Sequence, residues 1–294
     1  MRSYLDGFMR ECGYREDAIC YLLDAYDKLS SDGNTLQGLI MEYEADYTVS
    51  FESMLNKVRE LSERVGVHVY TADLVLAICF TRGLKKHYIN AGISLDIWKN
   101  SVLDLRYKLD ECICVKGIIG SFVARWFSGF FDLTRFALGR LQFEIVSFGA
   151  EYETEGLRLS HDSKLINVHI PRTGARLDRE STLESYRLAK EFFLPKLGDN
   201  PVFVCSSWLL FPRHKQMLRP GSNLISFIGD YTLIASGEYA DYGEVWRLFD
   251  TAYDGDPTHL PADSSLRRSY LELIKDGEKT GWGKGIFTFN SLKE

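Results

Sequence analysis

The sequence predicts an α+β (mixed α/β) protein in two parts. An all-helical N-terminal domain, residues 1–136, precedes a domain of one mixed β-sheet with packed helices, residues 137–294. The chain has 294 residues, which exceeds the roughly 100–200 residues of a usual domain. Apolar residues recur at the helical period up to about residue 135, and short runs of Val, Ile, Phe and Tyr between turn residues then indicate strands.

Three helices are clear in the N-terminal part. Residues 51–65 carry apolar side chains on one face, with Ser50 as the expected N-cap and Gly66 as the residue that ends the helix. Two more amphipathic helices follow at residues 71–89 and 94–112, the second capped by Ser94. Their apolar faces predict helices that pack against one another.

The C-terminal part mixes strands and helices. A helix at 181–194 is expected to begin with a capping box of Ser181 and Glu184 and to stop at Pro195, and a helix at 264–276 is expected to end at Gly277. The glycine-rich GWGKG, residues 281–285, is interpreted as a turn. The predicted strands cover residues 141–148, 165–170, 202–210, 223–228, 231–235, 245–249 and 285–290.

Composition and motifs exclude several classes of function. The net charge is −6 and no run of Lys and Arg forms a basic stripe, so nucleic acid is not expected as a partner. No apolar stretch reaches a membrane-spanning length, which predicts a cytoplasmic protein without a membrane partner. The six cysteines form no CxxC pair, so neither a metal site nor a disulfide framework is expected. Motifs of serine hydrolases, zinc proteases and Walker-type nucleotidases are absent from the sequence.

A loop follows the predicted strand that ends at residue 170. The loop contains Arg172, Thr173, Gly174, Ala175 and Arg176, and a helix begins soon after it. Backbone N–H groups at a helix start favour an anion, and a glycine lets the backbone approach it closely, so the loop has the chemistry of a phosphate cradle. The alternative is an ordinary turn, because the acids at positions 178 and 180 complement the helix dipole without a ligand.

Several blocks along the chain resemble one protein family. In order, GRLQFE, VHIPRTGARL, SYRLAKEFF, CSSWLLFP, GSNLISF and LPADSSLRRSYLELIKDG are similar to the GNAT-like C-terminal domain of bacterial acyltransferase-domain-containing proteins, in which this domain follows a helical one. The resemblance spans nearly the whole chain. It implies transfer of an acyl group from acyl-coenzyme A to a small amine or alcohol acceptor. A non-catalytic GNAT-derived module that binds a small ligand or a protein remains the alternative.

The resemblance also implies roles for particular residues. The GNAT pyrophosphate loop corresponds to Arg172–Ala175, with one residue fewer between the arginine and the first glycine than the family pattern has. Residues 202–210 correspond to the fifth GNAT strand, which parts from the fourth to admit the acyl thioester, so Ser206 and Ser207 are expected to line the slot.

The candidate catalytic residues lie in the predicted strands. His169 and Glu144 are the candidate general bases, because each is a titratable group in an otherwise apolar strand. Cys205 is a candidate nucleophile, with a buried core thiol as the alternative interpretation. Tyr231 and Tyr253 are candidates for protonating the leaving thiolate. We expect Asn167, His169, Cys205 and Ser207 to border one cavity.

Overall fold

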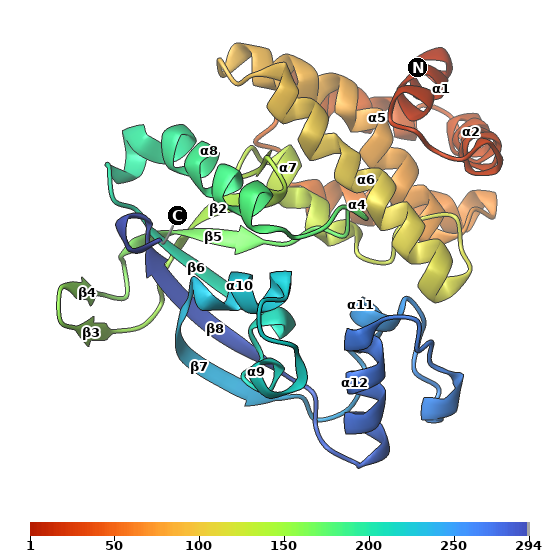
Figure 1. Cartoon of the computed structure of the whole chain (residues 1–294). Helices are drawn as coiled ribbons and strands as arrows, with labels where there is room; N and C mark the ends of the chain where they lie inside the picture. Colours follow the sequence, from red (N-terminus) through yellow and green to blue (C-terminus); the bar gives the residue numbers. More distant parts are fainter. Residues whose placement is uncertain (293–294) are drawn as a thin grey trace. The chain divides into compact units, whose positions relative to one another are not determined.

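The computed structural model describes residues 1–292 (Figure 1). Contacts between Cα atoms divide the chain into two compact units, Met1–Ala137 and Leu138–Glu294, and each is described by itself. Among the described residues, no helix is both long enough and apolar enough to cross a membrane.

The first unit is built from helices, apart from the strand residues at its C-terminal end, and α5 lies at its centre. Every residue from Thr71 to Thr81 of α5 is buried, because α2, α3, α4 and α6 all pack against it. The predicted caps are confirmed: Ser50 accepts a hydrogen bond from Ser53 N–H, and Gly66 adopts the left-handed conformation with φ 68°. The helices are α1 (Arg2–Glu11), α2 (Glu16–Ser31), α3 (Thr35–Ala45), α4 (Phe51–Val65), α5 (Val69–Asn90), α6 (Leu95–Lys116), η1 (Ala124–Phe127) and α7 (Ser128–Phe131).

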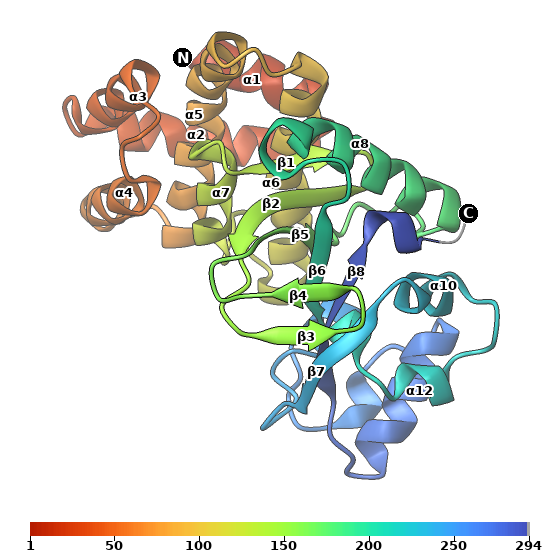
Figure 2. The same cartoon turned by 90° about the vertical axis from the view of Figure 1, so that its left-hand side faces the viewer.

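A six-stranded sheet organises the second unit (Figure 2). The strand order is β1-β2-β5-β6-β8-β7, and β5 and β6 run parallel, whereas β2 with β5, β6 with β8 and β7 with β8 are antiparallel. The division between the units falls within β1. The strands of this sheet are β1 (Arg135–Leu138), β2 (Leu141–Ser147), β5 (Lys164–His169), β6 (Val202–Ser207), β7 (Thr232–Glu238) and β8 (Gly281–Thr288); β3 (Tyr152–Thr154) and β4 (Leu157–Leu159) form a separate hairpin.

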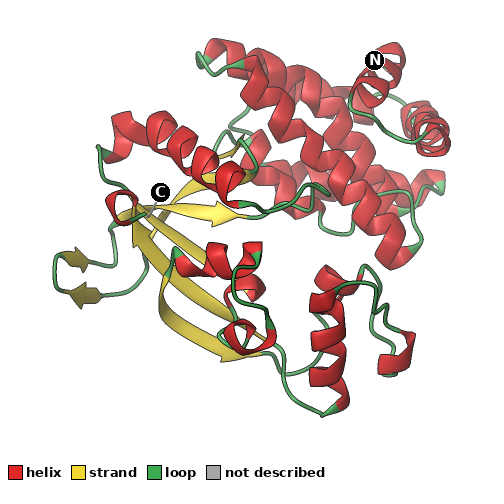
Figure 3. Cartoon of the chain, viewed as in Figure 1, coloured by secondary structure: helices red, strands yellow, loops and turns green. Residues whose placement is uncertain are grey.

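Helices and short turns connect these strands (Figure 3). Helix α8, the longest of the second unit, places Tyr186 against Phe203 and Phe287 on one face of the sheet. On the other face, the β3–β4 hairpin packs Leu159 with Leu165 and other apolar residues. The helical elements are α8 (Arg179–Leu197), η2 (Trp208–Leu210), α9 (His214–Met217), α10 (Asn223–Gly229), α11 (Trp246–Phe249), η3 (Pro257–His259), α12 (Ser265–Lys275) and η4 (Phe289–Ser291).

Two predicted strands are wrong. Residues 223–228 form helix α10, because Ser222 caps its first turn by accepting a hydrogen bond from Ile225 N–H. Residues 245–249 form the short helix α11 instead of a strand. Short apolar runs fit a buried helix and a buried strand equally well, so their periodicity does not separate the two.

The predicted ends of helix α8 also need correction. Asp178 is the N-cap in place of Ser181, and it accepts a hydrogen bond from Ser181 N–H at 2.9 Å. Pro195 lies inside the helix, near its C-terminal end. Proline has no backbone N–H to donate, but only one hydrogen bond close to the end of the helix is lost, so the helix continues through it.

The GWGKG segment is part of strand β8, and its interpretation as a turn is wrong. Gly281, Gly283 and Gly285 alternate, so all three face the same side of the sheet. A Cβ on Gly283 would collide with the backbone of Leu210, and a Cβ on Gly285 would lie 2.7 Å from Tyr231 Cβ. The glycines therefore let Leu210, which follows β6, and Tyr231, which precedes β7, lie directly on the strand.

Candidate active site

The parallel strands β5 and β6 pair over a short distance and then separate. Their register contains the pairs Ile166↔Phe203 and Asn167↔Val204, although β5 continues to His169. Strand β6 continues to Ser207 and there remains paired with β8. The carboxyl ends of β5 and β6 therefore part within the sheet, as the resemblance implied for the fourth and fifth GNAT strands.

Three polar side chains cluster on one face of the sheet beside this opening. Glu144 of β2 stands opposite Asn167 of β5, and His169 lies two residues further along the same face. His169 Nε2–H donates to Glu144 Oε1 over 2.7 Å, and Asn167 Nδ2 donates to the same oxygen over 3.3 Å. The side chains of His169 and Glu144 are 21% and 16% exposed, so the pair is partly shielded from water but still accessible.

This pair has the chemistry of an oriented base. A carboxylate hydrogen-bonded to an imidazole fixes the ring orientation and stabilises the positive charge that the ring gains when it takes a proton. The sequence identified both residues as candidates, but their direct contact depends on the antiparallel register of β2 and β5.

Cys205 lies on the opposite face of the sheet. The register pairs Asn167 with Val204, so the next residue, Cys205, points away from the His169 side, and so does Ser207. The predicted common cavity of Asn167, His169, Cys205 and Ser207 is therefore wrong, whereas Ser206 shares the His169 face and is exposed. Register decides this outcome, because a shift of one residue reverses the face of every side chain in a strand.

The environment of Cys205 is that of a core thiol. Its side chain is fully buried, and burial raises the pKa of the thiol to about 12, with a hydrogen bond from Tyr231 acting in the opposite sense. Tyr231 is itself buried and lies 3.0 Å from Tyr186, hydroxyl to hydroxyl, and burial raises its pKa well above the usual value. Neither group ionises near neutral pH in this setting.

The loop between β5 and α8 is braced by arginines. Arg172 pairs with Asp250 at 2.8 Å, so this guanidinium is held by a carboxylate of the same unit. Arg140 Nη1 donates to the carbonyl of Pro171 at 2.9 Å, and Arg140 Nη2 donates to the carbonyl of Ala175 at 3.2 Å. Arg140 and Asp250 carried no signal in the sequence, because both contacts join distant parts of the chain.

The rest of the loop is exposed and compact. Gly174 has φ 80°, a conformation that favours glycine, and Ala175 N–H donates to Thr173 Oγ1 at 3.2 Å. Arg176 is exposed at the end of the loop. The capping hydrogen bond from Ser181 N–H lowers the pKa of Asp178, so this carboxylate is ionised at the start of α8.

Two other expectations concern tyrosine and metal. Tyr253 lies on the surface and donates its hydroxyl hydrogen to the carbonyl of Gly255 at 3.0 Å. Within residues 1–292, no group of three or more His, Cys, Asp and Glu side chains is arranged to hold a metal ion.

Comparison with known proteins identifies the fold and the family. Residues 135–287 match the family model described as the GNAT-like C-terminal domain. No curated protein matches the chain. A crystal structure of an acyltransferase in complex with decanoyl-CoA and teicoplanin superposes with a TM-score of 0.66 at 19% identity, covering 97% of this chain and 99% of that one.

Other solved acyltransferase structures superpose on this chain equally well. An acyltransferase in complex with decanoyl-CoA gives a TM-score of 0.68 at 17% identity, over 96% of this chain and 98% of that one. A mutant acyltransferase in complex with octanoyl-CoA gives 0.65 at 18% identity, over 97% and 99%. At such identities the likeness establishes the fold, and it confirms the predicted order of a helical region followed by a mixed sheet. Because the family model covers more than half of its residues, the chain belongs to the family of proteins with a GNAT-like C-terminal domain.

Proposed function

We propose that this protein transfers an acyl group from acyl-coenzyme A to a small amine or alcohol acceptor. The observation that carries the proposal is the His169–Glu144 pair beside the opening between two parallel strands. The family match supports it, as do the neighbouring structures with decanoyl-CoA and octanoyl-CoA. On this proposal the protein acts in the cytoplasm, where such thioesters are available.

The reaction requires a base and no covalent enzyme intermediate. The nitrogen or oxygen of the acceptor attacks the thioester carbonyl carbon, the carbon–sulfur bond breaks, and coenzyme A leaves as a thiolate. His169 takes the proton of the acceptor, and Glu144 stabilises the resulting imidazolium. The thiolate takes its proton from solvent. We leave Cys205 out of the catalytic set, because a buried thiol with a raised pKa is a poor nucleophile.

The segment from Arg172 to Arg176 is the proposed phosphate-binding loop, and Ser206 is the proposed polar contact for the pantetheine arm. The loop offers a positive charge at Arg176, exposed backbone at Gly174 and Ala175, and a following long helix.

Replacement of the proposed base tests the mechanism. His169→Gln and Glu144→Gln are each expected to slow acyl transfer by about 10²–10⁴-fold, the usual contribution of a positioned base. The assay follows release of the coenzyme A thiol from decanoyl-CoA with a panel of primary amines. His161→Gln is the matched control, because His161 is an exposed surface histidine. Unchanged rates in both variants would remove His169 and Glu144 from the mechanism.

A non-catalytic binding module is the second candidate function, and the ion pair of Arg172 with Asp250 in the loop after β5 supports it. Arg172 is engaged by Asp250, and Asp178 places a carboxylate at the start of α8, so the phosphate-binding chemistry is partly neutralised. A non-catalytic binding module would need no cofactor in this loop. Isothermal titration with coenzyme A separates the two candidates, since a module of this kind would give no heat of binding.

A further inference from the structure

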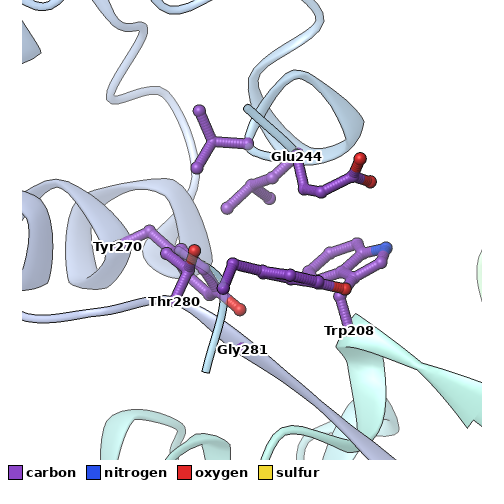
Figure 4. Close-up of a pocket in the computed structure, with 8 residues that line it drawn as sticks. Trp208, Glu244, Tyr270, Thr280 and Gly281 are labelled. Carbon is purple, nitrogen blue, oxygen red and sulfur yellow. The ribbon is translucent and has the colours of Figure 1, made fainter. Parts of the chain in front are cut away.

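A small hollow in the second unit lies beside Trp208, Tyr270 and Thr280 (Figure 4). It has room for about one water molecule. The carboxylate that borders it, Glu244, is already paired with Arg247. The hollow therefore has no room for an organic ligand.

Arg140 joins the two ends of the loop that follows β5. Its guanidinium donates from Nη1 to the carbonyl of Pro171 at 2.9 Å and from Nη2 to the carbonyl of Ala175 at 3.2 Å. A planar guanidinium presents its N–H groups in a fixed fork, so it holds two carbonyl groups at once in one orientation. Arg140 therefore spans the loop from Pro171 to the residue before Arg176.

The turn that carries Arg140 is itself seated on helix α8. Arg140 N–H donates to Ser185 Oγ at 2.8 Å, and that hydroxyl donates to the carbonyl of Ser181 at 2.7 Å. The preceding residue, Gly139, has φ 70°, and a Cβ there would lie 2.7 Å from Ser185 Oγ. Glycine thus lets the turn between β1 and β2 lie directly on α8. The backbone of Arg140 is therefore fixed relative to the helix that begins just after the loop.

The hydrogen bonds of Arg140 set the direction of two peptide groups in the loop. The C=O and N–H of a trans peptide group point in opposite directions, and the chain has no cis peptide bond among its described residues. The carbonyls of Pro171 and Ala175 face Arg140. The N–H groups of the residues that follow them, Arg172 and Arg176, therefore point to the opposite side of the loop. Backbone N–H groups on that side favour an anion.

Arg140 also brings a positive charge to the loop. The hydrogen bonds from Ser181 lower the pKa of the Asp178 carboxyl, and the nearby charges of Arg140 and Arg176 act in the same direction. The charge of Arg140 therefore partly offsets the negative charge that Asp178 places at the start of α8.

We propose that Arg140 is a positioning residue for the phosphate groups of coenzyme A. It holds the carbonyls of the loop on one side, so that the N–H groups of Arg172 and Arg176 face a phosphate before the cofactor arrives. Such preorganisation tightens binding, because the loop loses less conformational freedom when the phosphate binds. The inference rests on the proposed function, in which this loop binds phosphate, and it gives Arg140 no contact with the reacting atoms.

Arg140→Met and Arg140→Lys in the whole protein test this role. Isothermal titration with coenzyme A is expected to show about tenfold weaker binding for Arg140→Met, the equivalent of one hydrogen bond to a charged group. Arg140→Lys should bind nearly as weakly, because an ammonium keeps the charge but lacks the fork that holds both carbonyls. KM for decanoyl-CoA should rise by the same factor while kcat stays within about twofold, because the His169–Glu144 pair is untouched.

Trypsin cleavage reports on the loop without any ligand. Trypsin cuts after arginine where the backbone opens, so both Arg140 variants should be cut after Arg172 and Arg176 about fivefold faster than the unmodified protein, as mass spectrometry would measure. Arg187→Met is the matched control, because Arg187 lies on the exposed surface of α8, and its loop should be cut at the unmodified rate.

The two measurements separate the failure of this inference from the failure of the proposed function. Unmodified cleavage rates in both Arg140 variants, or coenzyme A binding by Arg140→Lys as tight as in the unmodified protein, would overturn the positioning role alone. Absence of coenzyme A binding in the unmodified protein would refute the proposed function, and with it the phosphate-binding role of Arg140. Arg140→Lys, which keeps the charge, decides the outcome if Arg140→Met does not fold.

Discussion

The loop that follows β5 gives the sharpest test of cofactor binding. Arg172 and Arg176 are its two cationic side chains, and we predict that replacing both by alanine weakens coenzyme A binding. Their charges act on the phosphates, so removing them should leave the fold intact. Arg172→Ala leaves Asp250 paired with Arg267 at 2.7 Å, and no buried charge loses its only partner.

The expected magnitude follows from the exposure of these groups. Hydrogen bonds to charged groups contribute about 1.5–3 kcal/mol each. The Arg172 side chain is 36% exposed and must first share or leave Asp250, so its net contribution is expected at about 1 kcal/mol. Arg176 is exposed, and we expect a similar contribution from it to the binding free energy. The double variant should therefore lose about 2 kcal/mol of binding free energy, which is an affinity for coenzyme A about 30-fold weaker.

A variant with the opposite effect strengthens the test. Asp250 has φ 59°, a left-handed conformation that asparagine also tolerates, so Asp250→Asn should fold normally. It removes the carboxylate that competes with phosphate for Arg172 and should therefore tighten coenzyme A binding by a few-fold. Arg187→Ala on the exposed surface of α8 removes a charge of the same sign and serves as the control.

Isothermal titration of coenzyme A at two salt concentrations measures these effects. The difference between the unmodified protein and the double variant should shrink as salt rises, because exposed charges are screened within about 10 Å at 0.1 M salt. Equal affinity of the double variant and the unmodified protein would mean that coenzyme A binds elsewhere. Tighter binding in Asp250→Asn with no loss in the double variant would contradict the role of Arg172.

Three further predictions concern the core, the pH dependence and the domains. Cys205→Ala should lower the free energy of unfolding by about 1 kcal/mol yet leave the transfer rate within about twofold, as chemical denaturation and the thiol-release assay would measure. Burial lowers the pKa of His214, so the unfolded state binds the proton more tightly; stability should fall as pH drops below about 6.5, by up to about 1.4 kcal/mol per pH unit, and His214→Gln should remove this part of the slope. Residues 1–136, which we propose as a separate domain, should be helical by circular dichroism and unfold cooperatively when expressed alone; a gradual transition would contradict that boundary.

Local features of the fold were predictable from the sequence. Ser50 and Gly66 mark the ends of α4, because caps act on backbone groups within one turn of the helix. Strand β5 was predictable from the alternation of apolar and polar residues between 165 and 170. The helix formed by residues 223–228 was not predictable, because a short apolar run fits a strand as well as a helix that Ser222 caps.

The candidate site was predictable in its members but not in its arrangement. His169 and Glu144 stand out as titratable groups in strands, but their contact requires the register of β2 against β5. Strand register also places Cys205 on the other face, because the direction of its side chain depends on which residue of β6 pairs with Asn167. The ion pair of Arg172 and Asp250 joins segments with no local signal between them.

Thermal unfolding with and without decanoyl-CoA tests the central claim, that this GNAT-like protein uses acyl-coenzyme A, most directly. A ligand at a hundred times its dissociation constant should stabilise the folded state by about 2.7 kcal/mol. For a chain of this size we predict a rise of several degrees in Tm, with a smaller rise for coenzyme A alone and none for free decanoate. An unchanged Tm with every acyl-CoA up to millimolar concentration would contradict the claim.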